Sequence, residues 1–183
     1  FLLNSPVGPM TRKNTMADFE ESRDAFHRND HPDAQWFPQK RMGLFLHWGI
    51  HSVAGIQPSW AMIKDYPHAG TADYPPQRYF GLANQFNPQH YEPERWLSAA
   101  SHAGFTYAVL TTKHHDGYTL WPSDHGYFGT AQHLGGTDLV APYVQACRNT
   151  GMRVGLYFYY EDWHYPGFPV GDVGFDHNRR GQS

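Results

Sequence analysis

Two adjacent histidines and an aspartate stand where an apolar run of this sequence ends. The segment from Tyr107 to Tyr118 begins with apolar and β-branched residues and closes on His114, His115 and Asp116 before a glycine. Such a pattern is typical of a buried parallel strand whose carboxyl end opens into a site. Neighbouring side chains on a strand point in opposite directions, so both histidines can reach one ligand only if the strand already breaks into a loop here. The alternative is a polar exit from the strand with solvated histidines.

Two other segments repeat this pattern. Residues 43–51 and residues 154–163 are short apolar runs that end in aromatic and titratable side chains. In α/β barrels and open α/β sheets, the chemistry lies at the carboxyl ends of the strands. The three segments therefore predict one shared cavity, formed by His47, His114, His115 and Tyr157. Neutral imidazole both donates and accepts hydrogen bonds.

Taken in order, these segments resemble the α-L-fucosidases of glycoside hydrolase family 29. The resemblance extends from about Trp36 to about Trp163, and its most specific part is the Thr-Thr-Lys-His-His-Asp-Gly run. The residues that carry it are His47-Trp48-Gly49, the run from Leu110 to Gly117, Asp138-Leu139-Val140, the run from Val154 to Tyr157, and Asp162-Trp163. The resemblance implies the N-terminal part of a glycosidase catalytic domain.

Long segments with helical patterns separate the expected strands, which are residues 42–47, 106–113 and 153–159. An apolar stripe from Trp96 to Ala103 predicts one helix, and Gly104 is its expected C-terminal cap. A second helix is expected from near Asp138 to Gly151, with Pro142 in its first turn. This alternation predicts an α/β fold, namely a partial (β/α)8 TIM-like barrel that contains the first three or so βα units.

The length of the chain sets the expected domain organisation. A complete (β/α)8 barrel needs roughly 250 residues, whereas this chain has 183 and begins with phenylalanine. We therefore expect a truncated catalytic domain. Residues 1–35 are polar and irregular and form a lead-in, with a short helix expected around residues 16–27. Residues 36–183 form the N-terminal portion of the barrel.

The composition narrows the function classes. A net charge of −3 gives no indication of nucleic acid or of an anionic membrane as a partner. Aromatic residues make up 16% of the chain, which suits stacking on sugar faces, although most aromatic side chains fill cores. The single cysteine, Cys147, excludes an internal disulfide and is expected to be a buried, inert thiol.

Several properties stay open at this stage. Neither a transmembrane run nor a signal peptide is visible, and the compartment is not determined. The family makes a secreted, periplasmic or lysosomal-type location plausible. The oligomeric state and the fucosyl linkage are not determined either.

The resemblance also implies an activity and a set of site residues. The implied reaction is a retaining exo-glycosidase reaction that releases terminal α-L-fucose from glycans, with no cofactor and no metal. Substrate contacts are implied for five residues: His47, Trp60, His114, His115 and Tyr157. Both catalytic carboxyl groups, an aspartate nucleophile and an acid/base, are implied to lie beyond Ser183. We therefore expect no catalytic residue in this chain, and no activity from these 183 residues alone.

Three polar residues need separate interpretation. Many family members carry an acidic residue immediately before the tryptophan that corresponds to Trp60, where this chain has Ser59. That departure puts a carboxylate–sugar contact in question and points to altered specificity. Asp116 is predicted to anchor its loop through backbone N–H groups, and Asp162 is predicted to hold the loop after the third strand.

Two alternative functions remain. A metal-dependent barrel hydrolase would use as ligands His47, His51, His114, His115 and Asp116. Metal-binding barrels often present His-x-His on the first strand, and the spacing from His47 to His51 differs from that. A non-catalytic sugar-binding relative is the other alternative, which the presence of an aspartate and a glutamate on later strands would decide.

Overall fold

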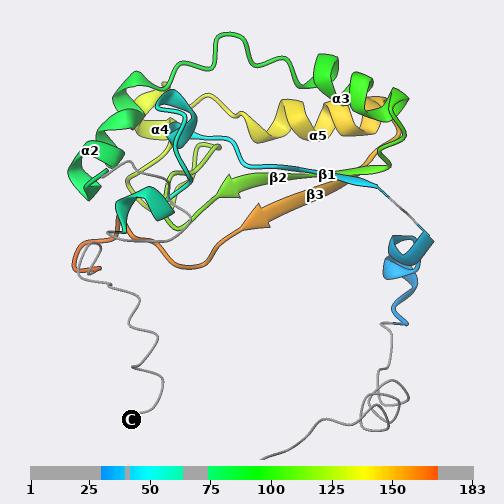
Figure 1. Ribbon diagram of the computed structural model, residues 1–183, viewed down its shortest axis with the longest axis horizontal. Coiled ribbons are helices and arrows are strands. Elements are labelled where there is room, and N and C mark those ends of the chain that lie inside the picture. The colour runs from blue at the N-terminus through cyan, green and yellow to red at the C-terminus, as the bar shows by residue number, and fades with distance from the viewer. Residues whose placement is uncertain (1–29, 40–41, 64–73, 169–183) are drawn as a thin grey trace, which may run out of the picture. The chain divides into compact units, whose positions relative to one another are not determined.

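The computed structural model describes residues 30–39, 42–63 and 74–168 (Figure 1). The chain divides into two compact units, Phe1–Gln39 and Lys40–Ser183. The described part of the first unit contains two 3-10 turns, η1 (Pro32–Ala34) and η2 (Phe37–Gln39). The helix expected around residues 16–27 lies outside the described residues.

Three parallel strands form the sheet of the second unit. They are β1 (Gly43–Leu46), β2 (Tyr107–Lys113) and β3 (Arg153–Phe158), in the spatial order β1-β2-β3. The three predicted strands are therefore confirmed. β1 and β3 each end one residue earlier than expected, so His47 and Tyr159 lie just beyond their carboxyl ends.

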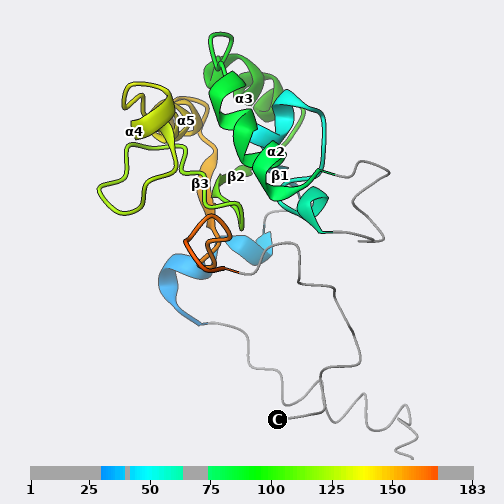
Figure 2. The same ribbon diagram turned by 90° about the vertical axis from the view of Figure 1, so that its left-hand side faces the viewer.

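Two helices of ten residues each lie on one face of this sheet (Figures 1 and 2). α3 (Pro93–His102) has Pro93 in its first turn, and Gly104 follows it with a φ of 95°. α5 (Val140–Asn149) begins where the Asp138 carboxylate accepts hydrogen bonds from the N–H groups of Val140 and Ala141, at 2.8 and 3.0 Å. These are the two helices that the sequence predicts, including Pro142 in the first turn of α5.

The core lies between the sheet and these helices. Leu46, Leu110 and Leu156 are paired in register across the three strands and so share the face on which the helices lie; Leu110 on the central strand is buried, whereas Leu156 on β3 is 51% exposed. Buried residues of the core include Leu97, Ala108, Leu110, Tyr143 and Cys147. Full burial of one such leucine stabilises the fold by about 1.5–3 kcal/mol. Cys147 is fully buried, and burial raises the pKa of its thiol, as expected for an inert cysteine.

The opposite face of the sheet has a different character. No helix among the described residues of the second unit covers it, and Phe45 on this face is 51% exposed. Two glycines keep the face flat: the Tyr107 ring occupies the space above Gly43, and a Cβ at Gly155 would lie 2.7 Å from Val109 Cγ2. Phe45 and His47 share this face, as the alternation of side chains predicts, and their rings stack at 4.9 Å.

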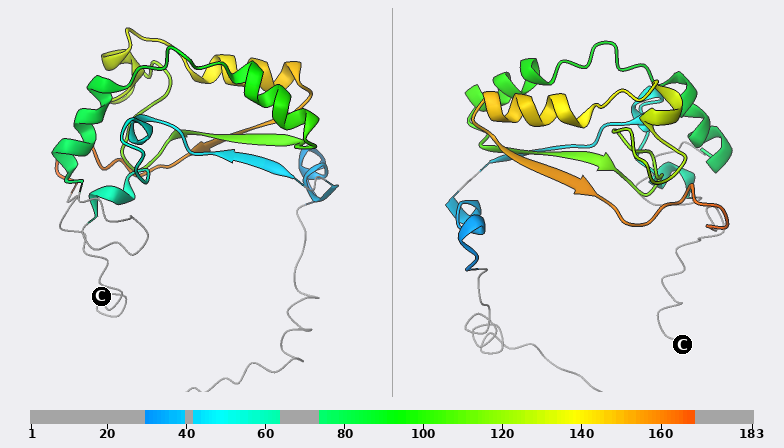
Figure 3. Two further views of the ribbon diagram at one scale, coloured as in Figure 1. Left: turned by 45° about the horizontal axis from the view of Figure 1, so that its top comes forward. Right: turned by 180° about the vertical axis from the view of Figure 1, so that it is seen from behind.

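The connecting segments gather at the carboxyl ends of the strands (Figures 1 and 3). After β1 come η3 (Ile50–Val53), η4 (Trp60–Met62), α2 (Pro76–Phe80) and η5 (Gly81–Gln85). The glycine-rich stretch 126–136 was expected to be a loop, but it contains the short helix α4 (Thr130–His133). The glycines of this stretch, such as Gly129 and Gly135, flank α4 and are not part of it, so they do not prevent the helix from forming. No described helix is long and apolar enough to cross a membrane.

Candidate functional site

β2 contains a bulge near its carboxyl end, and this bulge changes the direction of the side chains that follow it. Thr111 pairs with Tyr157 and Lys113 with Phe158, so Thr112 is an extra residue on β2. Its hydroxyl donates to the carbonyl oxygen of Tyr157 at 2.9 Å. A bulge of this kind re-aims the side chains that follow it. His114 and His115 accordingly turn towards each other, with their Nδ1 atoms 3.0 Å apart.

The side chains predicted to form the site lie next to one another. The His47 ring centroid is 5.7 Å from that of His114 and 6.1 Å from that of Tyr157, and the His114 and Tyr157 centroids are 5.9 Å apart. Trp60, from the loop after β1, lies 4.7 Å from His115. The structure thus brings all five predicted residues to one place. Their contact with substrate stays a prediction.

The cluster is unevenly buried. His114 and His115 are only 6% and 4% exposed, whereas His47 is exposed and Tyr157 is half-buried. Sequence reasoning predicted one cavity at the strand ends. Within the described residues of the second unit the cluster is instead open on the side of His47, because none of that unit's described elements covers the face of the sheet from which His47 projects.

Two further aromatic residues belong to the cluster and were not among the predicted site residues. The Tyr159 and Trp163 ring centroids lie 3.7 and 4.7 Å from that of His115. The Trp163 indole N–H donates to Glu161 Oε2 at 3.1 Å, and its backbone N–H donates to the His115 carbonyl at 2.6 Å. The sequence holds one indication of this: Tyr157 and Tyr159 alternate, so a continued strand would place them on one face.

Lys113 fastens the loop after β3 to β2. Its ammonium group donates to the backbone carbonyls of Tyr159 and Glu161 at 3.0 and 2.7 Å. Burial lowers the pKa of Lys113, while Asp162 and Asp116 oppose that change. The lysine of the Lys-His-His run therefore positions the loop that carries Tyr159 against His115.

A buried polar network lies beneath the histidines. The Tyr79 hydroxyl donates to Asp116 Oδ2 and accepts from the Ser59 N–H, both at 2.8 Å. Asp116 Oδ1 accepts from the Tyr118 N–H at 3.0 Å, which confirms the predicted role of Asp116 as a loop anchor. Tyr79 was not singled out from the sequence, because it lies 37 residues from Asp116 in the chain.

Ser59 joins this network to the imidazoles. Its Oγ lies 2.7 Å from His114 Nδ1 and accepts from the Asp116 N–H at 2.9 Å. The side chain is fully buried. The serine that replaces the acidic residue of many family members thus bonds to protein groups on both sides.

The electrostatic setting keeps the imidazoles neutral. Burial lowers the pKa of His114 to about 3, and the neighbouring His115 and His47 contribute in the same direction. Burial also lowers the pKa of His115 and of His51 to about 4 in each case. Burial raises the pKa of Asp116 to about 6, although the Tyr79 hydroxyl and the Tyr118 N–H stabilise its charged form.

The remaining carboxylates near the strand ends hold loops. Asp162 Oδ1 accepts from the N–H groups of His164 and Tyr165 at 3.0 and 3.1 Å. Asp162 also packs against Gly117, where φ is 81° and the Asp162 carboxylate fills the space of a Cβ. This arrangement confirms the role predicted for Asp162. Neither Asp116 nor Asp162 is positioned by these contacts as a free nucleophile.

The metal alternative would draw its ligands from the histidines at the strand ends and from Asp116. Within residues 30–39, 42–63 and 74–168, no group of three His, Cys, Asp or Glu side chains is placed to hold a metal ion. His114 Nδ1, which a metal would compete for, already faces Ser59 Oγ and His115 Nδ1.

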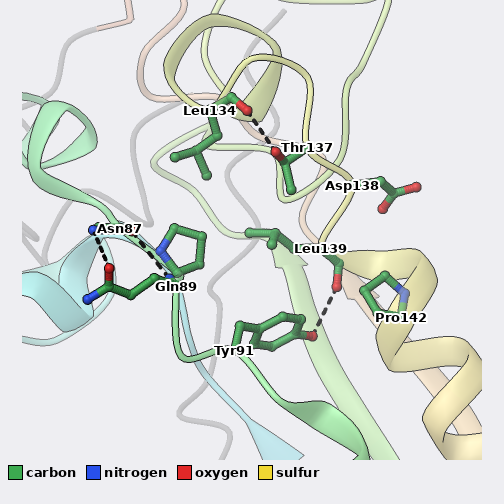
Figure 4. Close-up of a pocket in the computed structure, with 9 residues that line it drawn as sticks. Asn87, Gln89, Tyr91, Leu134, Thr137, Asp138, Leu139 and Pro142 are labelled. Atoms are coloured by element: carbon green, nitrogen blue, oxygen red, sulfur yellow. Dashed lines mark hydrogen bonds between the residues drawn. The ribbon is translucent and has the colours of Figure 1, made fainter.

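A separate cavity of about 430 Å³ lies between the loops that precede α3 and α5 (Figure 4). Several of its polar groups are already bonded within the protein: the Tyr91 hydroxyl donates to the Leu139 carbonyl at 2.9 Å, and the Thr137 hydroxyl donates to the Leu134 carbonyl at 2.8 Å. The cluster at the strand ends is therefore the stronger candidate for a functional site.

Comparison with known proteins agrees with this geometry. Residues 9–178 match the sequence model of the family described as "Alpha-L-fucosidase". The chain is 34% identical to the tissue α-L-fucosidase of Mus musculus over 144 residues, which cover 74% of this chain and 32% of the mouse protein. The chain belongs to the α-L-fucosidase family, and it spans about a third of the length of the curated relatives that it matches.

Solved structures give the same result. α-L-Fucosidase isoenzyme 1 from Paenibacillus thiaminolyticus is 35% identical with a TM-score of 0.62, covering 75% of this chain and 31% of that one. A family 29 α-L-fucosidase from Bacteroides thetaiotaomicron, trapped as a covalent intermediate with 2-fluoro-fucosyl fluoride, is 28% identical with a TM-score of 0.65. That match covers 77% of this chain and 33% of the Bacteroides chain.

Proposed function

We propose that the protein containing this chain is a retaining exo-glycosidase that releases terminal α-L-fucose from glycans. The observation that carries the proposal is the convergence of His47, His114, His115 and Tyr157 at the carboxyl ends of three parallel strands, in a chain of the α-L-fucosidase family. The fucosylated glycan is the proposed partner.

The proposed architecture is a (β/α)8 TIM-like barrel. Residues 36–183 would be its N-terminal portion, with the first three or so βα units, and residues 1–35 would be a lead-in. The order β1-β2-β3, with α3 and α5 on one face, supports this arrangement. The exposure of Phe45 on the other face supports it as well, because the interior of a barrel is filled by such side chains.

The role proposed for each site residue follows from the chemical groups of its side chain. Neutral His47, His114 and His115 bind sugar hydroxyls, since each ring offers one donor and one acceptor. Trp60 and Tyr157 present aromatic faces to the apolar side of the sugar. Contacts of this kind strengthen as the ring distorts towards the oxocarbenium-like transition state, so they contribute to turnover as well as to binding.

The catalytic carboxyl groups are proposed to come from residues beyond Ser183. A retaining enzyme uses two carboxyl groups about 5–5.5 Å apart, one of which forms a covalent glycosyl-enzyme. The covalent intermediate of the Bacteroides relative supports that mechanism for the family. Asp116 and Asp162 are engaged in backbone hydrogen bonds, which leaves this chain the binding part of the reaction.

The test is an assay of the full-length protein with an aryl α-L-fucoside, followed by NMR of the first product. We expect turnover, and fucose released first as the α-anomer. Initial release of the β-anomer would disprove retention. Binding of fucose without any hydrolysis would identify the protein as a sugar-binding relative instead.

A further inference from the structure

Ser59 occupies an unusual position in the fold. It is the only non-glycine residue with a positive φ among the described residues, at 59°. Such a backbone costs an ordinary residue on the order of 1–3 kcal/mol and persists only where the surroundings hold it. Here the Tyr79 hydroxyl accepts from the Ser59 N–H at 2.8 Å, and the side chain is 0% exposed. Ser59 therefore acts through its protein neighbours and not by direct contact with a ligand.

The hydrogen bonds of Ser59 define the direction of its hydroxyl proton. The Asp116 N–H can only donate, so Ser59 Oγ accepts there, at 2.9 Å. The other contact of Oγ is His114 Nδ1 at 2.7 Å. If His114 Nδ1 carried a proton and donated it, the Ser59 hydroxyl would have no acceptor in the described part of the chain. If the Ser59 hydroxyl donates, each proton has an acceptor.

The position of the proton on His115 follows from the same argument. The Nδ1 of His115 lies 3.0 Å from His114 Nδ1. When His114 Nδ1 is the acceptor, His115 Nδ1 must carry the proton, because otherwise two lone pairs would face each other. The single lone pair of His114 Nδ1 is then shared, and it receives the Ser59 hydroxyl at 2.7 Å and, more weakly, the His115 N–H at 3.0 Å. In a neutral ring the second nitrogen has the opposite role. His114 Nε2 is then a donor and His115 Nε2 an acceptor, and neither Nε2 is hydrogen-bonded within the described residues.

We propose that Ser59 is a positioning residue that fixes the tautomers of the His114–His115 pair, so that the pair presents one donor and one acceptor to the hydroxyl groups of the sugar. This proposal rests on the proposed function for its ligand, but not for its tautomers. The low pKa values of both rings are consistent with it, since both imidazoles are then neutral at neutral pH. A vicinal diol matches such a pair, because one hydroxyl can accept while the other donates.

The first test needs no substrate. The full-length protein is labelled with ¹⁵N-histidine, and the His114 signals are assigned by comparison with His114→Gln. We expect an unprotonated Nδ1 at His114 and a protonated Nδ1 at His115. In Ser59→Gly, which keeps a backbone suited to positive φ, the His114 signals should show a mixture of tautomers. A protonated His114 Nδ1 in the wild-type protein, or spectra unchanged in Ser59→Gly, would overturn the proposal.

The second test measures specificity. Aryl α-L-fucosides that lack one hydroxyl each are compared in the wild-type protein and in Ser59→Gly. We expect kcat/KM of Ser59→Gly on the parent fucoside to fall about tenfold, as for the loss of one directed hydrogen bond. The hydroxyl whose removal costs the wild-type protein most should cost Ser59→Gly little. Ser59→Cys, which keeps a weaker donor, should recover part of the loss.

Controls separate positioning from a merely structural role. Ser101→Ala removes a hydroxyl that donates to the Thr150 carbonyl at 3.2 Å, far from the strand ends, and should leave the deoxy-sugar pattern unchanged. Equal sensitivity of wild-type and Ser59→Gly proteins to each missing hydroxyl would refute the proposal. Absence of turnover in the wild-type protein would instead refute the proposed function, and the NMR experiment would still decide the tautomers.

Discussion

The end of β2 and the ends of β1 and β3 differ in how completely this chain builds them. Behind β2, Ser59, Tyr79 and Asp116 form a buried network with the backbone, in contact with His114. At the ends of β1 and β3, His47 and Tyr157 have ring contacts but remain exposed or half-buried. The polar site at the end of the central strand is therefore preformed. The side chains at the two flanking strands lack comparable surroundings among the described residues.

This difference between the strand ends shows which part of the site has a fixed geometry. Groups in the β2 network are bound on several sides, so their positions are costly to change. His47 and Tyr157 depend on whatever packs against the open face of the sheet. Four predictions test this contrast.

The largest effect is expected from separating these 183 residues from the rest of the protein. The chain expressed alone should not hydrolyse an aryl α-L-fucoside, because the proposed carboxyl groups are missing. It should also aggregate, since one face of the sheet bears exposed apolar groups such as Phe45. Activity and light scattering measured beside the full-length protein check both points. The contrary result is that the separate chain hydrolyses the fucoside and loses that activity when Asp116 or Asp162 is mutated. That result would contradict the proposal that the catalytic carboxyl groups lie beyond Ser183.

Removing the centre of the β2 network should cost stability. Asp116→Ala leaves the Tyr79 hydroxyl and the Tyr118 N–H without their acceptor inside the protein. We expect the free energy of unfolding to fall by about 3 kcal/mol, measured by urea denaturation. Asp124→Ala removes an exposed carboxylate of the segment that follows β2 and serves as the control, with a change within about 0.5 kcal/mol. Equal effects of the two substitutions would show that the network adds nothing.

The two classes of histidine should separate in their effects. His47→Ala and His115→Ala should each lower kcat/KM by an amount equivalent to about 1–3 kcal/mol. Only His115→Ala should also lower the melting temperature, because His115 is buried and His47 is exposed. His102→Ala, at the far end of α3, is the control for both measurements. Unchanged kinetics in both site variants would reduce these histidines to ordinary loop residues.

The pH dependence of stability should reflect the buried imidazoles. His51, His114 and His115 have pKa values of about 4, 3 and 4 in the folded protein, below the ordinary 6.5. The unfolded chain therefore binds more protons below pH 6.5, and the free energy of unfolding falls as the pH drops. Asp116, with its pKa raised to about 6, opposes this fall between about pH 6 and 4.

The loss should already be clear between pH 7.5 and 6, because the imidazoles of the unfolded chain take up protons around pH 6.5 while those of the folded protein stay neutral. Denaturation midpoints measured at several pH values check the sign. Asp116→Asn removes the opposing group, so its midpoint should fall more steeply below pH 6. A midpoint that rises on acidification would contradict neutral buried histidines.

Much of the fold was predictable from sequence because its determinants are local. Apolar runs fixed the three strands to within a residue at each end, and the stripe from Trp96 to Ala103 fixed α3. The roles of Asp116 and Asp162 were also predictable, since both bond to backbone groups two or three residues away. The strand ends likewise indicated His47, His114, His115 and Tyr157, because parallel strands place their carboxyl ends at one edge.

Other features depended on contacts between distant segments. Tyr79 reaches Asp116 across 37 residues, and Ser59 reaches His114 across 55, so no local pattern contains either pair. The bulge at Thr112 arises from the register between β2 and β3, and it determines that both histidines turn to one side. The sequence by itself determined which chemical groups gather at the strand ends. Only the tertiary structure decided which are buried, which nitrogen faces which partner, and hence which groups remain free for a ligand.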